Sequence, residues 1–494
     1  MSQMSHMNQL KQMIVRKVLV VICLFLCSNA LWAQREINSD FSLGMGGTIG
    51  GVYNPLWLRA NQYGLVPASG SYGFSAFSHR MGYRPKKQVD WAYGFSTQVN
   101  LGENKADVFF PELYVKSKVG IFELVVGRQK QIFGLVDSTL SSGSYIWSGN
   151  ALPIPKVELQ VKEYWSPGFL KGVLAFKGNY SHGWFENSRE DVKDFYLHQK
   201  SFYGRFGKPN WKVKFYAGFN HQVQWGGKLK YADPYNVNSH NGIIPSDFNT
   251  YVSVVTGRSN AIKGDTATYG YNDGFNRSGN HLGTVDIGME VELNQAKIFF
   301  YRQSIYEDGS LYYGNNITDG LHGLSITRKA DQGLIKVVLE YLNTTSQGGN
   351  TFNDQSKIRG FDDYLNNGVY QNGWTYFGKG IGTPLLTLDS ESDLNPTNSI
   401  YYDNNRVEAF YAAGEFAFGD NKIQLRASLS NAIGWFGKEY SPVKKQYSGG
   451  ILWHRRISIT GFPEALLKAN LGIEKGNLTQ PTLGGNIAIS IPLN

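Results

Sequence analysis

The stretch that decides the fold reads WAYGFSTQVNL and covers residues 91–101. Large apolar side chains alternate in it with small or polar ones: Trp91, Tyr93, Phe95, Val99 and Leu101 against Ala92, Gly94, Ser96, Gln98 and Asn100. Period-two alternation is typical of a β-strand, because successive side chains point to opposite faces. The run is about as long as a tilted strand must be to cross the hydrocarbon layer of a membrane, roughly 9–11 residues.

The same pattern recurs along the chain, at residues 211–219, 285–293 and 423–429. Soluble strands are usually shorter, so length and pattern together favour a membrane over a soluble β-sandwich with one wet face, which is the alternative. The chain length allows on the order of 16–18 strands, and closure favours an even number. We therefore predict an all-β protein, an antiparallel β-barrel of the Gram-negative outer membrane.

Connections between these runs differ strongly in length. The predicted tight turns are Gly102-Glu103-Asn104, Gly207-Lys208-Pro209-Asn210, Asn294-Gln295-Ala296 and Gly419-Asp420-Asn421. The predicted long polar stretches are 137–156, 222–283, 343–407 and 431–450. Outer-membrane barrels have short periplasmic turns and long extracellular loops, so we interpret the long stretches as extracellular.

Two segments are predicted to be short helices. Asn54-Pro55 begins one near residues 54–64, since proline suits a first helical turn. Ser246 can cap another, which ends at Gly257. Either helix could plug the barrel, or could be a surface helical turn.

The first 33 residues have the three parts of a secretory signal peptide. These are the basic residues Lys11, Arg16 and Lys17, the apolar run 18–27, and the small residues Ser28, Ala30 and Ala33. We expect cleavage after Ala33 and a single barrel domain over residues 34–494; a lipoprotein anchored at Cys27 is the alternative. Both cysteines, Cys23 and Cys27, would be removed, which excludes a disulfide or a thiolate metal site from the mature chain.

Composition excludes several classes of function. The formal net charge of +9 is spread along the chain without a dense basic cluster, so nucleic-acid binding is not predicted. No motif of a serine hydrolase, a phosphate-binding loop or a zinc protease occurs, so we predict no enzyme and no cofactor. Five histidines are scattered in the sequence, and we predict no metal site from them: His182, His198, His221, His281 and His322.

Polar and aromatic residues cluster in a mixture that can bind sugars. Ring faces pack on sugar C–H groups, while amides, carboxylates and guanidinium groups bond to hydroxyls. One such cluster covers 198–206 and 221–227, which a hairpin brings toward the same rim. The predicted polysaccharide contacts are Arg59, Arg128, Gln129, Lys200, Tyr203, Arg205, Trp225, Gln303, Glu307 and Asp308. The alternative is an inward polar network that only satisfies its own members, with Tyr203 and Trp225 as girdle residues.

Several motifs resemble the Wzi-type capsule assembly family, most of all its Bacteroidetes-type members. They are Trp57-Leu58-Arg59-Ala60-Asn61-Gln62-Tyr63-Gly64-Leu65-Val66-Pro67, the 198–227 hairpin, Tyr301-Arg302-Gln303-Ser304-Ile305-Tyr306-Glu307-Asp308, and segments at 140–143, 150–156, 372–379 and 381–384. The resemblance covers nearly the whole mature chain. It implies a barrel of about eighteen strands, occluded by helices and loops, that acts as a lectin and holds capsular polysaccharide on the cell surface.

The expected partners are therefore capsular or exopolysaccharide, outer-membrane lipid and the barrel assembly machinery. The competing prediction is a porin for sugars or oligosaccharides with an open lumen. An outer-membrane hydrolase or lipid-modifying enzyme is a third class, but we find no nucleophile placed next to a base by spacing.

Overall fold

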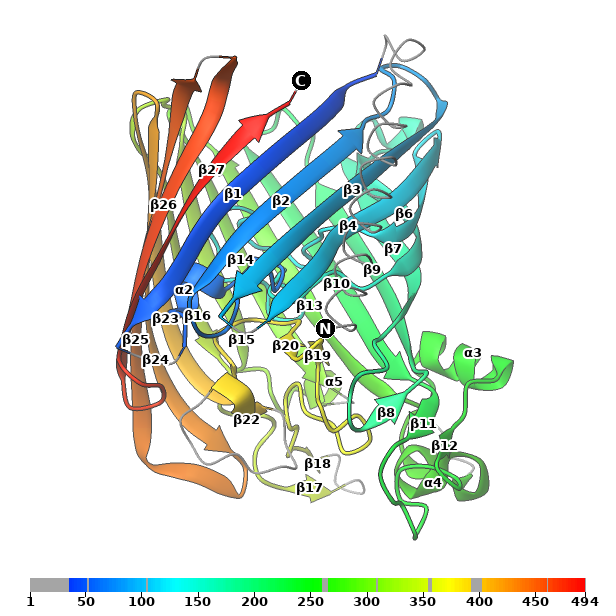
Figure 1. Ribbon diagram of the computed structural model, residues 1–494. Helices are drawn as coiled ribbons and strands as arrows, with labels where there is room; N and C mark the ends of the chain where they lie inside the picture. Colours follow the sequence, from blue (N-terminus) through cyan, green and yellow to red (C-terminus); the bar gives the residue numbers. More distant parts are fainter. Residues whose placement is uncertain are drawn as a thin grey trace, which may run out of the picture.

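Eighteen strands pair in one antiparallel sheet that closes into a barrel in the computed structural model (Figure 1). They are β1 (Ile37–Ile49), β2 (Tyr72–Met81), β3 (Val89–Gly102), β4 (Ala106–Val119), β5 (Phe122–Arg128), β6 (Lys156–Trp165), β7 (Leu174–Trp184), β9 (Tyr196–Phe206), β10 (Val213–Trp225), β13 (Asn280–Glu292), β14 (Ala296–Glu307), β15 (Gly320–Arg328), β16 (Gly333–Asn343), β23 (Arg406–Phe418), β24 (Asn421–Trp435), β25 (Lys438–Ile459), β26 (Phe462–Gly476) and β27 (Thr482–Pro492). Phe41 of β1 lies opposite Phe77 of β2 and Ile491 of β27, which closes the barrel. The predicted fold class is confirmed.

The structure describes residues 35–493, except 51–52, 104, 260–264, 308–309, 354–357, 392–401 and 460. The expected signal peptide, residues 1–33, lies outside the described residues. In the described part of the chain, no helix combines the length and the apolar character needed to cross a membrane.

The alternation in β3 places large apolar side chains outside the barrel and small or polar side chains inside, as expected. Trp91 is 41% exposed on the outer wall, whereas its neighbour Ala92 is fully buried on the inner face. The same holds in β13, where Ile287 is exposed and Asp286 is buried. Apolar side chains thus cover the outside of the barrel, as a lipid environment requires, and polar or small side chains face the lumen.

The two ends of the barrel differ in their connections. One end, called here the short-turn end, carries tight links such as 120–121 between β4 and β5 and 419–420 between β23 and β24. The other, the long-loop end, carries residues 129–155, 226–279 and 344–405.

Two connections differ from the sequence-based prediction. The turn after β3 lies at the long-loop end. Strand β3 begins at the short-turn end, and Leu101 at its other end pairs with Ala106 across this turn. Residues 431–450 form no loop, because β24 and β25 continue as a long hairpin in which Trp435 pairs with Lys438. Polar and charged residues such as Asn431 and Lys445 interrupt the apolar alternation in this hairpin, so hydropathy could not distinguish it from a loop.

The loops contain short elements of their own. These are α2 (Leu56–Arg59), η2 (Gly168–Leu170), β8 (Val192–Lys193), β11 (Gly227–Leu229), β12 (Ile243–Ile244), α3 (Phe248–Thr256), α4 (Thr266–Phe275), α5 (Ser310–Tyr313), β17 (Phe352–Asn353), β18 (Ile358–Arg359), β19 (Thr375–Tyr376), β20 (Lys379–Gly380), β21 (Thr387–Leu388), η3 (Asp389–Glu391) and β22 (Tyr402–Asn404). Helix α2 is a single turn inside the barrel, within the segment predicted as helical. Helix α3 lies outside the barrel wall (Figure 1), and its N-cap is Asp247 instead of Ser246.

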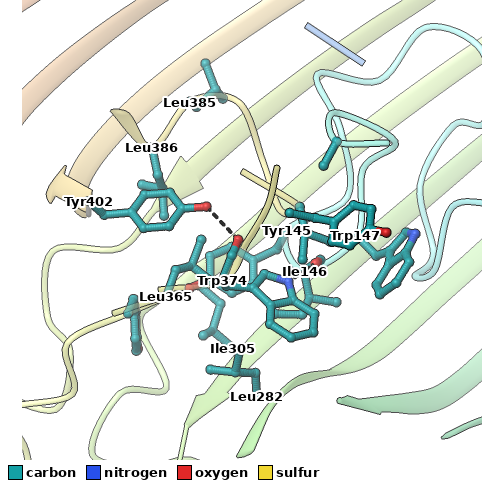
Figure 2. Close-up of a cluster of buried hydrophobic side chains, with 14 of the residues drawn as sticks. Tyr145, Ile146, Trp147, Leu282, Ile305, Leu365, Trp374, Leu385, Leu386 and Tyr402 are labelled. Carbon is teal, nitrogen blue, oxygen red and sulfur yellow. Dashed lines mark hydrogen bonds between the residues drawn. The ribbon is translucent and has the colours of Figure 1, made fainter. Parts of the chain in front are cut away.

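The lumen is filled by segments that fold inward. We call residues 53–66, 129–155 and 361–391 the plug. Their buried apolar side chains form one core with inner-wall residues such as Leu282 and Ile305 (Figure 2). The plug is therefore made mainly of loops; its helical parts are the single turn of α2 and the short 3₁₀ turn η3.

Candidate functional site

Polar side chains on the inner wall hold the plug by hydrogen bonds to its backbone. The Asp286 carboxylate accepts from Leu135 N at 2.8 Å. The Gln303 amide oxygen accepts from Tyr145 N at 2.8 Å, and the Glu340 carboxylate accepts from Ser142 N at 2.7 Å. Each bond satisfies a buried loop N–H that has no ladder partner. The wall thus fixes the path of residues 129–155.

Trp374 lies at the centre of the plug core (Figure 2). Its indole Nε1 donates to Ile146 O at 2.8 Å, and Tyr402 donates its hydroxyl to Trp374 O at 3.0 Å. The Trp374 ring packs edge to face with Trp147, 6.1 Å between centroids. Since Trp147 belongs to residues 129–155 and Trp374 to residues 361–391, these contacts join two plug segments into one unit.

A buried ion pair at Glu391 joins plug segment 53–66 to plug segment 361–391. Arg59 of α2 lies 2.7 Å from Glu391 Oε2, and Lys379 lies 3.5 Å from Glu391 Oε1. Burial alone would raise the pKa of Glu391, but the adjacent guanidinium and ammonium groups outweigh it and hold this pKa below its ordinary value. Glu391 is therefore charged in the folded protein at neutral pH.

The lowered pKa makes the contribution of Glu391 to stability dependent on pH. A carboxylate with a lowered folded-state pKa stabilises above its unfolded-state pKa, roughly 4.3, and loses that contribution as pH falls through the folded-state value. We expect Glu391→Gln to unfold at a lower temperature than the wild type at pH 7, with the difference shrinking below about pH 4. Thermal unfolding of both proteins by near-ultraviolet circular dichroism measures this, and a pH-independent difference would contradict it.

Four of the predicted polysaccharide contacts are engaged inside the protein. Arg59 pairs with Glu391, and Gln303 holds Tyr145 N. Glu307 accepts from Leu365 N at 2.9 Å. Tyr203 is buried and donates its hydroxyl to Asp286 at 3.0 Å. These side chains support the plug and its wall.

Three further residues of that prediction lie at other points of the lumen. Arg128 donates to the hydroxyl of Tyr376 at 2.9 Å. Gln129 is partly buried, and its Oε1 has no hydrogen-bond partner in the described part of the chain. Arg205 lies over the ring of Tyr164, 5.6 Å from its centroid. Asp308 lies outside the described residues.

Lys200 and Trp225 lie on the outer wall. Lys200 points to the same side of β9 as the exposed Phe202, and Trp225 to the same side of β10 as the exposed Phe219. Helix α3 covers both: Lys200 Nζ donates to Val255 O, and the Trp225 ring lies 5.9 Å from that of Tyr251. The predicted cluster is thus divided between the two faces of the wall.

The interpretation that the histidines are scattered is wrong for four of the five. His182, His198, His221 and His281 form a row across β7, β9, β10 and β13 on the outer wall, with neighbouring ring centroids 5.0–6.1 Å apart. Strand register brings them together, which sequence spacing does not reveal. Among the residues that the structure describes, no three His, Asp, Glu or Cys side chains are placed to hold a metal ion.

The long-loop end presents exposed tyrosines that the sequence analysis missed. Tyr235 is 86% exposed and Tyr271 is 61% exposed. They lie on adjacent segments, since Tyr271 N donates to Asn236 O at 2.9 Å. Asn272 Nδ2 donates to Asn238 Oδ1 at 2.7 Å beside them. We call Tyr235, Asn236, Asn238, Tyr271 and Asn272 the tyrosine platform.

Comparison with known proteins gives one family and several similar folds. The family model described as capsule assembly protein Wzi matches residues 60–391. Among solved structures, Pseudomonas aeruginosa OpdH is 10% identical with a TM-score of 0.49, covering 94% of this chain and 99% of that one. Pseudomonas aeruginosa OpdL is 8% identical with a TM-score of 0.48, covering 94% and 100%. Pseudomonas aeruginosa OprD is 9% identical with a TM-score of 0.46, covering 93% and 95%. No curated protein matches the sequence.

Proposed function

Because this chain belongs to the Wzi capsule assembly family, we propose that it binds capsular or exopolysaccharide and holds it on the cell surface. The family and the eighteen-stranded barrel with an apolar outer wall place the protein in the Gram-negative outer membrane. The proposal includes no catalytic role. We also propose that the barrel assembly machinery inserts the protein into the outer membrane. The motifs quoted above favour membership of the Bacteroidetes-type branch of the family.

The filled lumen is the observation that most supports binding over transport. A sugar porin needs a water-filled passage through the barrel. Here the plug core packs Trp374, Tyr145 and Leu365 against the wall, and hydrogen bonds that the plug backbone donates to Asp286 and Glu340 hold it there. Opening a passage would expose this core to water, which costs roughly 25 cal/mol for each Å² of apolar surface.

The tyrosine platform has the chemistry that a glycan surface needs. Exposed rings offer flat apolar faces to sugar C–H groups, and adjacent amides donate to and accept from hydroxyls. Hydrogen bonds between the two segments fix the backbone that carries the rings before binding, which lowers the entropy that binding costs. We therefore propose Tyr235 and Tyr271 as surface contacts with the polysaccharide, in place of the buried Tyr203 and Glu307.

The decisive test is the distribution of surface polysaccharide between cells and medium in a strain that lacks the protein, beside its complemented parent. Retention predicts unchanged synthesis, with polymer lost from the cells and recovered in the medium. Unchanged cell-bound polymer would rule out retention. Planar-bilayer recordings distinguish a porin from a plugged binding protein. A steady large current from the wild type would favour transport, and the absence of current fits a plugged binding protein.

Replacing Tyr235 and Tyr271 together by alanine is expected to weaken glycan binding about thirtyfold, because each of the two rings contributes on the order of 1 kcal/mol. Cell-bound polysaccharide in the complemented strain measures this, with barrel yield measured in parallel. The matched control is Tyr447→Ala, since Tyr447 is also an exposed tyrosine but lies on β25 of the outer wall. Equal retention by both variants would show that the platform does not contact the polymer.

A further inference from the structure

A cavity of about 640 Å³ lies in the lumen between α2 and the short-turn end. Trp57, Leu58 and Leu65 of the plug line it on one side, and strands β1 to β3 and β24 to β27 form its walls. Its volume falls within the range of small-molecule sites, roughly 300–1,000 Å³. Because the plug closes the other side, a ligand would enter from the short-turn end, which faces the periplasm in outer-membrane barrels.

Most of the charged side chains that line this cavity are basic. Lys130, Arg426 and Lys468 line it, and none of them has an ion-pair partner among the residues that the structure describes. Arg80 also lines it but pairs with Glu112, and the lining carboxylate is Asp40. Asp40 lies near enough to Lys468, and Glu112 near enough to Lys130, for their charges to act on these two ammonium groups. The basic groups still outnumber the nearby carboxylates, so the cavity favours a ligand with a negative charge.

Unsatisfied polar atoms add a second, independent indication of a ligand. Arg426 Nε, Ser96 Oγ and Asn470 Oδ1 are buried and have no hydrogen-bond partner among the described residues. Buried polar atoms are bonded in most native proteins. A guanidinium N–H suits a carboxylate, while a hydroxyl and an amide oxygen suit the hydroxyls of a sugar.

The cavity also offers an aromatic ring for a sugar to pack on, because Phe74 of β2 lines it. We propose that this cavity is a second binding site, separate from the tyrosine platform and reached from the short-turn end, for a short acidic oligosaccharide. Arg426 and Lys468 bind its carboxylate, Ser96 and Asn470 bind its hydroxyls, and Phe74 packs on a sugar ring. This inference does not require that the protein retain surface polysaccharide.

Isothermal titration of the folded, full-length mature protein in detergent with trigalacturonate tests the site. We expect binding that weakens with added salt, because salt screens partly exposed charges. Lys468→Gln should weaken it about tenfold and Lys468→Gln with Arg426→Gln about a hundredfold, since each charge-assisted hydrogen bond contributes at least that factor. The matched control is Lys228→Gln, an exposed lysine in β11 at the long-loop end.

Each other result counts against the site. No binding by the wild type, or equal binding by the wild type and Lys468→Gln, overturns the proposal. If the double variant fails to fold, the single variant Lys468→Gln decides. The Arg426 side chain also donates to Gln424 at 3.2 Å, whereas the Lys468 side chain makes no hydrogen bond among the described residues. Equal affinity for a neutral galactose trisaccharide would exclude recognition of charge, and equal affinity for inorganic phosphate would exclude recognition of the sugar. Polysaccharide retention by the Lys468→Gln strain tests the surface function separately.

Discussion

A Trp374→Ala variant is expected to keep its barrel but to lose about 3–5 kcal/mol of plug stability. Trp374 is fully buried, its ring contacts Trp147 and Phe185, and its indole N–H satisfies Ile146 O. Alanine would leave a cavity and an unpaired buried carbonyl. Planar-bilayer recordings should change from silence to stepwise currents, and residues 361–391 should become sensitive to limited proteolysis.

The matched control is Phe377→Ala, three residues further along the same segment. Phe377 is about half exposed, and its contact with Glu186 uses the backbone N–H, which the substitution keeps. This variant should remain silent and resistant to protease. Similar currents from both variants, or a silent and resistant Trp374→Ala protein, would show that the plug does not depend on this core.

The strands could be predicted because a lipid-facing wall imposes a local rule. In β3 and β13 every second side chain meets lipid, so apolar residues such as Trp91 and Ile287 recur at a spacing of two. The rule depends only on neighbours in the sequence. It fails at 431–450, where polar and charged residues such as Asn431 and Lys445 interrupt the apolar series along the hairpin of β24 and β25.

The plug could not be predicted in the same way. Residues 129–155 and 361–391 have neither a strand nor a helix period, and Trp374 reads as an ordinary loop aromatic. Its burial comes from Ile146, a residue far away in the sequence, and from a wall that exists only once the barrel has closed. Polar composition correctly indicated loops, but not that these loops turn inward.

The candidate site shows the same limit. Tyr203, Gln303 and Glu307 have the chemistry of sugar ligands, but amides, carboxylates and hydroxyls also satisfy the N–H groups of buried loops. The sequence alone does not distinguish a sugar partner from a buried loop N–H group. The structure gives loop or wall partners to all three, and exposes Tyr235 and Tyr271, which lie in a long loop without any recognisable motif.

Glu340 of the wall accepts two hydrogen bonds from the plug, and removing it tests whether the wall holds the plug in place. Its Oε1 accepts from Ser141 Oγ at 2.6 Å and from Tyr301 at 2.5 Å, and its Oε2 accepts from Ser142 N at 2.7 Å. Glu340→Ala would leave buried donors without an acceptor, each costing about 1–3 kcal/mol. We expect faster hydrogen exchange across residues 129–155 by mass spectrometry, together with bilayer currents.

The matched control for this variant is Glu415→Ala. Glu415 lies on the neighbouring strand β23, and its carboxylate accepts from Gln424 of the wall at 2.7 Å. Because this bond joins wall to wall, its loss should leave exchange in residues 129–155 unchanged. If Glu340→Ala also leaves it unchanged while the barrel stays folded, the plug core alone holds the loops inside, and the wall carboxylates only satisfy them. Faster exchange in Glu340→Ala alone would show that closure of the lumen depends on the wall as well as on the core around Trp374.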